Sequence, residues 1–507
     1  MDKLVGIKID RQAKIPLYLQ IKNQLKEMIL TGVIPEESRL FPSRKLAKLL
    51  KVNRSTVVAA YEELLAEGLT EAHVGRGTIV RKKGYFLEGR SLSHPFNWSE
   101  FLALSPPFHL DSLLRDIIAY CSSEDIISLA AGVPATELFP VEEFREVIND
   151  ILRKEKYQVF QHCPTEGYYP LRELLANWSI NPQGGSSPDN VFIVSGSQQG
   201  LYLLAEIFLN PGDVVIVESP TYVGALSVFR ARGARIVGIP GDEKGLRVDV
   251  LENLLWRQVP RLIYILPTFQ NPRGVVLSPE RRKEILELAY RFRVPIIEDD
   301  PYSHLYFKNP PPASLKSQDK YDQVIYLSTF SKIIFPGLRV GWINAPRPVV
   351  ERLSQVKQFL DLHSPTLGQR ALYEFCRRGL LEGHLEKSRE IYARKKDIML
   401  KALHRFCSPW LTSTDPEGGF YLWGELPPGW DSKELLREAV DEKVVFVGGE
   451  TFFPEGEGQN YLRLNFSFQP EELLIEGSRR LGRALTKLAE RNKDHQERRK
   501  LNSKPIV

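Results

Sequence analysis

Residues 327–342, LSTFSKIIFPGLRVGW, contain the pattern on which the interpretation of this sequence depends. Lys332 follows two hydroxyl residues, Thr329 and Ser331, directly after an apolar run that has the character of a buried strand. Arg339 follows a few residues later in PGLRVGW. Hydroxyl and guanidinium groups are ordinary partners of a phosphate. The stretch therefore predicts a lysine placed beside an anion-binding group at the end of a strand.

Apolar runs of strand length surround this pattern and alternate with helical stretches. The runs are VFIVSG (191–196), DVVIVES (213–219), ARIVGIP (234–240), RLIYILP (261–267), VPIIEDD (294–300), QVIYLSTF (323–330) and VGWINAP (340–346). Continuous apolar strands separated by helices are typical of a mainly parallel sheet that is covered on both faces. The expected fold class of this part is therefore α/β, with a large domain over about residues 160–350 and a smaller α+β part over about residues 385–489.

Polar side chains follow two of these strands at their ends. Ser197 and Gln198 open an apolar helix after the first strand, and a helix N-terminus of this kind is suited to bind a phosphate. Asp299 ends the strand VPIIEDD, and Tyr302 comes three residues later. A carboxylate buried in that position favours a positively charged neighbour, such as a protonated ring nitrogen.

Three further residues fit the same kind of site. Tyr222, in SPTYVG, is suited to stack on a planar ring, and Asn271, in PTFQNPRG, has an amide that can bond a phenolic oxygen. Arg463, in YLRLNFS, is suited to hold a substrate carboxylate through two hydrogen bonds. Each residue alone has an ordinary structural explanation, such as a core tyrosine or a solvated charge. Their joint order and spacing are what point to one site.

Together these motifs resemble the aminotransferase-like fold-type I pyridoxal-phosphate proteins, over about residues 125–489. The resemblance implies that pyridoxal phosphate is the cofactor and that Lys332 bonds to it covalently. It also implies that Asp299 holds the ring nitrogen, while Asn271 and Tyr302 bind the ring oxygen. The phosphate would be bound by Ser197, Gln198, Thr329, Ser331 and Arg339, and a substrate carboxylate by Arg463.

His162 departs from this resemblance. It stands before CPTEG, at a position where the family often has a tyrosine that reaches the phosphate of the neighbouring subunit. The effect of the histidine on that contact stays open.

The N-terminal residues 14–81 have a different pattern, which predicts three helices. The first covers residues 15–30. The second is capped by Ser43 and ends at Leu50, and the third covers residues 54–67 and is capped by Asn53. A hairpin with Gly75 and Gly77 around Arg76 follows. This order is that of a winged helix-turn-helix, whose second helix lies in the major groove of DNA.

The stretch IPLYLQIKNQL…LTGVIPEESRLFPSRKLAKLLKVNRSTVVAAYEELLAEGL…VGRGTIV resembles the GntR family of bacterial regulators. The residues expected to contact double-stranded DNA are Arg44, Arg54, Ser55, Thr56 and Arg76. Residues 1–83 contain sixteen Lys and Arg against nine Asp and Glu, so their net charge is +7, although the whole chain carries +5. A basic module on a weakly acidic body indicates a polyanionic partner for the module alone.

Composition excludes several other classes. The four cysteines, Cys121, Cys163, Cys376 and Cys407, have no paired spacing, so neither a disulfide framework nor a metal site is expected. No apolar run is long enough to span a membrane, and the start lacks a signal-peptide pattern, so we expect a cytoplasmic location. Residues 82–125 are rich in Gly, Ser and Pro with interspersed aromatics, and are expected to form a linker that packs in part on a domain surface.

A GntR-type module ahead of an aminotransferase-like domain at 126–489 resembles the MocR/GabR family of transcription regulators. The resemblance implies a head-to-tail homodimer that binds an operator of two half-sites and senses pyridoxal phosphate, an amine or an amino acid. An active aminotransferase with an accessory DNA-binding module is the alternative, since the predicted catalytic set of Lys332, Asp299 and Tyr302 is complete. A storage or scaffold protein has no feature in its favour. Neither the effector nor the sign of regulation is determined by the sequence.

Overall fold

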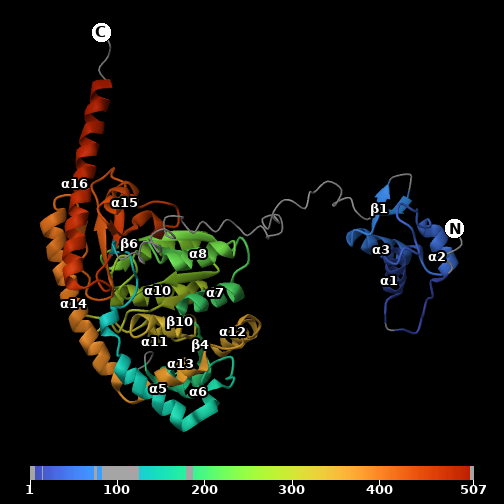
Figure 1. Cartoon of the computed structure of the whole chain (residues 1–507), viewed down its shortest axis with the longest axis horizontal. Helices are drawn as coiled ribbons and strands as arrows, with labels where there is room; N and C mark the ends of the chain where they lie inside the picture. The colour runs from blue at the N-terminus through green and yellow to red at the C-terminus, as the bar shows by residue number, and fades with distance from the viewer. Residues whose placement is uncertain (1–5, 14, 74–76, 83–124, 179–185, 503–507) are drawn as a thin grey trace. The chain divides into compact units, whose positions relative to one another are not determined.

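The computed structural model describes residues 6–13, 15–73, 77–82, 125–178 and 186–502 (Figure 1). The chain divides into two compact units, residues 1–103 and 104–507. The predicted linker at 82–125 lies outside the described residues except at its two ends, and so does Arg76. None of the described helices is long and apolar enough to cross a membrane.

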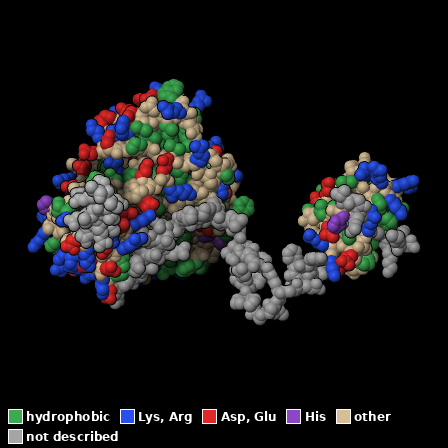
Figure 2. All heavy atoms as spheres, turned by 90° about the horizontal axis from the view of Figure 1, so that it is seen from above, with side chains coloured by type: hydrophobic (Ala, Val, Ile, Leu, Met, Phe, Trp, Pro, Cys, Tyr) green, Lys and Arg blue, Asp and Glu red, His purple; other side chains and the backbone are tan. Residues whose placement is uncertain are grey.

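The N-terminal unit is a three-helix bundle followed by a two-stranded hairpin. Its elements are α1 (Leu17–Leu30), α2 (Ser43–Leu50), α3 (Arg54–Ala66), β1 (Thr70–His73) and β2 (Gly77–Val80). Leu25 of α1 and Leu64 of α3 are wholly buried in its core, because the apolar residues of each helix recur at helical spacing. Lys and Arg side chains are spread over the visible face of this unit (Figure 2).

Two details of this unit differ from the sequence interpretation. Ser43 is the first residue of α2 rather than its cap, because Pro42 precedes the helix and no side-chain cap bond forms there. The segment before α2 also pairs with the wing: the Leu40 amide donates to the carbonyl of Thr78 at 2.9 Å, and the Glu37 amide donates to that of Val80. The wing is therefore anchored to the chain that leads into the helix-turn-helix.

The larger unit is built around an eight-stranded sheet in the order β4-β11-β10-β9-β8-β5-β6-β7. The strands are β4 (Val191–Val194), β5 (Val214–Ser219), β6 (Arg235–Asp242), β7 (Gly245–Leu246), β8 (Leu262–Ile265), β9 (Ile296–Asp299), β10 (Val324–Thr329) and β11 (Gly341–Asn344). The pairing is parallel, as expected, for the five central strands β10, β9, β8, β5 and β6. Strand β11 runs antiparallel to both of its neighbours, because the connection from β10 is too short for a crossover.

Helices cover both faces of this sheet (Figure 1). One face packs against α7 (Ser197–Phe208), α8 (Val223–Ala231) and α12 (Arg347–Leu360). The other face packs against α9 (Val248–Arg257), α10 (Pro279–Phe292) and α11 (Leu315–Gln318). Successive residues of β5, β8 and β9 alternate between these two clusters. The strands are therefore buried on both faces, which explains why they read as continuous apolar runs.

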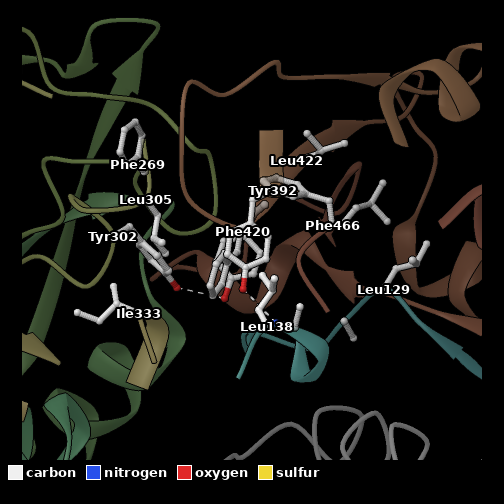
Figure 3. Close-up of a cluster of buried hydrophobic side chains, with 14 of the residues drawn as sticks. Leu129, Leu138, Phe269, Tyr302, Leu305, Ile333, Tyr392, Phe420, Leu422 and Phe466 are labelled. Atoms are coloured by element: carbon white, nitrogen blue, oxygen red, sulfur yellow. Dashed lines mark hydrogen bonds between the residues drawn. The ribbon is translucent and has the colours of Figure 1, made fainter. Parts of the chain in front are cut away.

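A smaller part packs beside the sheet and contains a four-stranded sheet in the order β12-β13-β16-β15, with β3 and β14 paired separately. Its strands are β3 (Ile127–Ser128), β12 (Thr412–Ser413), β13 (Tyr421–Glu425), β14 (Val444–Val445), β15 (Val447–Gly448) and β16 (Tyr461–Asn465). The remaining helices are α5 (Val141–Glu155), α6 (Tyr169–Trp178), α13 (Thr366–Arg377), α14 (Leu380–Cys407), α15 (Ser432–Asp441) and α16 (Glu471–Asn502). A continuous core joins the two parts, and in it Tyr302, from the loop after β9, points toward Phe420 and Tyr392 of the smaller part (Figure 3).

Candidate functional site

A cavity of about 270 Å³ lies where the parallel strands end, beside the smaller part. It is lined by Gly132, Ser197, Gln198, Tyr222, Val223, Leu266, Asn271, Asp299, Pro301, Tyr302, Thr329, Ser331, Lys332, Arg339, Tyr421 and Arg463. All of the residues that the sequence predicts for a cofactor or a substrate are among them. They come together because loops after the carboxyl ends of parallel strands meet at one edge of a sheet.

Asp299 is the last residue of β9 and is almost wholly buried. Its Oδ2 atom accepts a hydrogen bond of 2.7 Å from the hydroxyl of Tyr264, while its Oδ1 atom has no partner among the described residues. Burial raises the pKa of this carboxyl to about 7. A buried carboxylate with one unpaired oxygen fits a positively charged donor in the cavity.

Lys332 ends the short 3-10 helix η6 (Phe330–Lys332) that follows β10. The Thr329 hydroxyl accepts the Ser331 amide at 3.1 Å and so turns the chain at the end of the strand. The Lys332 ammonium group donates to the Gly132 carbonyl at 2.5 Å. Burial lowers the pKa of Lys332, which increases the fraction of uncharged amine. An uncharged amine is the form that can act as a nucleophile.

An anion cradle lies between the start of α7 and Arg339. Gly196 precedes the helix with a φ of +87°, and a Cβ atom there would lie 2.3 Å from Nη2 of Arg339. Glycine thus lets the guanidinium approach the helix N-terminus, where Arg339 donates to the Ser195 carbonyl at 3.0 Å and to the Ser331 hydroxyl at 3.3 Å. Free amides and a guanidinium in this arrangement suit a phosphate.

Tyr222 and Gln198 form one wall beside this cradle. The Tyr222 hydroxyl donates to Oε1 of Gln198 at 3.1 Å, and the Gln198 amide donates to the carbonyl of Gly224. These bonds hold the Tyr222 ring at the edge of the cavity.

Arg463 lies on β16 at the opposite wall and is buried. It donates from Nη1 to Oδ1 of Asn271 at 3.0 Å and from Nη2 to the carbonyl of Ala130 at 2.9 Å. Its Nε atom has no partner in the described part of the chain. The bond to Asn271 uses the amide oxygen and leaves the amide NH₂ group as a donor toward the cavity.

Two of the cavity residues that the sequence analysis did not single out, Tyr421 and Gly132, form hydrogen bonds with predicted site residues. Tyr421 stands in the apolar strand GGFYLW and reads as an ordinary core residue, although its hydroxyl accepts a hydrogen bond of 3.2 Å from Tyr302. Gly132 lies far from Lys332 in the chain, and only the tertiary fold brings its carbonyl to the lysine.

Three of the predicted DNA-contact residues, Arg54, Ser55 and Thr56, lie in the first turn of α3, the second helix of the helix-turn-helix, and Arg44 lies on α2. Asn53 caps α3 through a bond of 3.2 Å from the Ser55 amide, as the sequence predicts. Arg44, Arg54 and Ser55 are exposed, and Nε of Arg54 donates to the Ser43 hydroxyl at 3.4 Å. Thr56 is half-buried. The first turn of α3 therefore presents a guanidinium and hydroxyls to the surface.

His162 lies outside the cavity lining. Its Nδ1 atom is 2.8 Å from Nε2 of His363, and the two rings are perpendicular. The histidine that replaces the usual tyrosine thus has a partner within its own chain.

Residues 17–80 match the bacterial regulatory proteins of the gntR family, and residues 124–476 match aminotransferase class I and II. The HTH-type transcriptional regulator YdfD of Bacillus subtilis is 34% identical over 95% of this chain and 98% of its own length. The "Probable rhizopine catabolism regulatory protein MocR" of Rhizobium meliloti is 28% identical over 86% of this chain and 87% of its own length.

Among solved structures, the α-aminoadipate aminotransferase LysN of Thermus thermophilus, complexed with N-(5'-phosphopyridoxyl)-L-leucine, is similar with 39% identity. The TM-score is 0.73, and the match covers 78% of this chain and all of that chain.

The chain therefore belongs to the aminotransferase class I and II family, as a member that has a gntR-family DNA-binding domain ahead of a fold-type I domain. This domain combination is that of the MocR group of HTH-type transcriptional regulators.

Proposed function

We propose that this protein is a transcription regulator that binds pyridoxal phosphate in the cavity and responds to an amine or amino acid there. The observation that carries the proposal is the unpaired, buried Oδ1 atom of Asp299, in the same cavity as Lys332. A protonated pyridine nitrogen is a donor of the charge and size that this oxygen requires. The gntR-family domain supplies the binding to DNA.

Pyridoxal phosphate supplies an aldehyde carbon that reacts with amines and a ring that withdraws electrons when its nitrogen is protonated. Asp299 would keep that nitrogen protonated, and the Asn271 amide and the Tyr302 hydroxyl would bind the ring oxygen. Lys332 would hold the cofactor covalently. The phosphate would lie at the start of α7 against Arg339, Ser331 and Thr329, with Ser197 and Gln198 beside it, and Tyr222 would stack on the ring.

Arg463 would bind the carboxylate of an amino-acid ligand. Its unpaired Nε atom supports this role, since a buried guanidinium N–H without an acceptor is costly and a carboxylate oxygen would satisfy it.

Arg44, Arg54, Ser55, Thr56 and Arg76 would contact DNA. We further propose a head-to-tail homodimer on an operator of two half-sites, since two copies of a helix-turn-helix related by two-fold symmetry bind related half-sites. Footprinting tests this directly. Protection of two related half-sites upstream of a gene, with visible cofactor absorbance in the same preparation, is the expected result, and a protein that protects no site contradicts it.

Retained aminotransferase activity is a second candidate function. The specific observation in its favour is that Lys332, Asp299 and Arg463 all line one cavity, with the pKa of the lysine lowered. Formation of a keto acid from an amino acid on incubation with the protein would establish it, and loss of that product in Lys332→Ala would assign it to this site.

A further inference from the structure

Tyr421 lines the cavity but has no part in the function proposed above. It is the first residue of β13, pairs with Asn465 across the sheet and is only 3% exposed. A core tyrosine needs a partner for its hydroxyl. Here that hydroxyl is directed to the cavity beside Lys332, and its partner is another cavity residue, Tyr302.

The surroundings of the Tyr421 oxygen place it close to the lysine. A Cβ atom on Gly132 would lie 2.5 Å from this oxygen, so only glycine leaves room for the hydroxyl at that point. The carbonyl of the same Gly132 accepts the hydrogen bond from the Lys332 ammonium group. The Tyr421 oxygen and the Lys332 ammonium group therefore lie on either side of Gly132, in one cavity.

Positive charge surrounds this phenol. The guanidinium of Arg463, on β16, lies 4.2 Å from the centre of the Tyr421 ring, and Lys332 approaches from η6. Tyr302, from the loop after β9, donates a hydrogen bond to Tyr421, and Tyr222, at the start of α8, lines the same cavity. The Tyr421 oxygen is thus an acceptor in the structure.

The electrostatics agree with this geometry. Burial acts to raise the pKa of Tyr421, but the charges of Arg463 and Lys332 and the hydrogen bond from Tyr302 outweigh it, and the pKa is lowered. Burial raises the pKa values of Tyr222 and Tyr302 in the same cavity. Tyr421 differs from Tyr302 because Tyr421 accepts the hydrogen bond between them, and because Lys332 also acts to lower its pKa.

We infer that the Tyr421 oxygen accepts a proton from the ammonium group of the amine ligand as that ligand reaches Lys332. An ammonium has no lone pair and cannot react as a nucleophile until one proton leaves. The acceptor is the phenolate form of Tyr421: one N–H bond of the ligand breaks, its electron pair stays on nitrogen, and an O–H bond forms that turns the phenolate into a neutral phenol. The inference rests on the proposed function, because it requires that the ligand is an amine.

Tyr421→Phe tests this by removing only the hydroxyl. Tyr392→Phe is the matched control, since Tyr392 is also buried and packs on Phe420, and within the described part of the chain its hydroxyl bonds to the Ala135 amide alone. The probes are L-alanine and propionate, which has the carboxylate but no amine. Their dissociation constants are measured with the full chain across a pH series, from the change in visible absorbance for L-alanine and by calorimetry for both.

We expect Tyr421→Phe to weaken L-alanine binding about tenfold near neutral pH, the effect of losing one charge-assisted hydrogen bond. The loss should disappear above the pKa of free L-alanine, where the amine needs no acceptor, and propionate binding should be unchanged. A loss that is equal at every pH, or equal for propionate, would show that the hydroxyl only supports packing and would overturn the inference.

A second readout needs no ligand. The ultraviolet absorbance of phenolate in wild type should rise at a lower pH than in Tyr421→Phe, whereas Tyr392→Phe should titrate as wild type does. Identical curves for wild type and Tyr421→Phe overturn the inference. If wild type binds no L-alanine at any pH, the proposed function is contradicted instead. The phenolate titration then still shows whether the pKa of Tyr421 is lowered.

Discussion

Asp299 in the cavity and Arg54 on the first turn of α3 carry opposite charges in opposite surroundings. Asp299 is buried, one of its oxygens is satisfied by Tyr264, and its pKa is raised by burial. Arg54 is exposed and makes only a long bond to the Ser43 hydroxyl. A buried charge depends on one exact partner, whereas an exposed charge binds a polyanion with little preorganisation. Changes in the cavity should therefore have larger and more pH-dependent effects than changes on α3.

The largest effect is expected from Lys332→Ala. The variant lacks the amine that bonds covalently to the cofactor, so dialysis should remove all visible absorbance while the wild type stays yellow. We expect little loss of stability, because the Gly132 carbonyl is the one hydrogen-bond partner of the Lys332 side chain among the described residues. Absorbance spectra before and after dialysis measure this, and a variant that keeps a borohydride-reducible visible band would refute the assignment.

The next effect concerns the pH dependence of stability without cofactor. The pKa of Asp299 is about 7 in the folded protein, above the usual value for an unfolded aspartate, so the unfolded state loses its proton first. The contribution of Asp299 to stability is therefore fully present below the unfolded pKa and is lost as pH rises through the folded pKa, by about 3–4 kcal/mol at most.

In cofactor-free protein, Asp299→Asn should reduce the fall in the free energy of unfolding as pH rises. Denaturant unfolding from pH 4 to pH 8 measures this, because that range spans the pKa values of Asp299 in the unfolded and folded states. Glu218 and Glu298, whose pKa values are also raised by burial, remain in both proteins and serve as the internal control. Equal slopes in both proteins would mean that Asp299 is not protonated in the folded state.

A smaller effect is expected from Arg54→Ala on DNA binding. Loss of one base or phosphate contact should cost about 1–3 kcal/mol, and loss of a phosphate contact should reduce the salt dependence of binding by about one ion. Operator titration at several salt concentrations distinguishes the two kinds of contact. Lys51→Ala, at the αL residue that ends α2, is a control for general loss of positive charge. Unchanged affinity would remove α3 from the interface.

The smallest effect is expected from Asn53→Ala, which removes the cap of α3. Caps of this kind contribute about 1 kcal/mol, and the loss should be confined to the N-terminal unit. Hydrogen exchange of the α3 amides measures this locally, with the amides of α10 as the reference. Faster exchange in both helices would mean that the two units unfold together.

The large sheet was predictable because its strands are buried on both faces and leave long apolar runs in the sequence, as in VFIVSG and VPIIEDD. The direction of β11 was not stated, since periodicity does not fix pairing. The pairing of residues 37–40 with the wing was missed for the same reason.

The candidate cofactor residues were predictable because they belong to short local motifs near strand ends, as Asp299 and Lys332 do. Tyr421 and Gly132 could not be found in this way. They reach the cavity through the packing of the smaller part against the sheet, and their identities also fit a strand and a loop with no chemical role.

We propose that the ligand state of the cavity changes the affinity of the protein for DNA. A ligand can shift this equilibrium only through its different affinities for the two states of the protein, and couplings of this kind are typically about 5- to 150-fold. The direct measurement is operator titration of wild type and Lys332→Ala, without cofactor, with pyridoxal phosphate, and with pyridoxal phosphate plus L-alanine. We expect the operator affinity of wild type to change within that range when the ligands are added. The affinity of Lys332→Ala should not change, although this variant should still bind the operator. Identical wild-type affinity under all three conditions would contradict it.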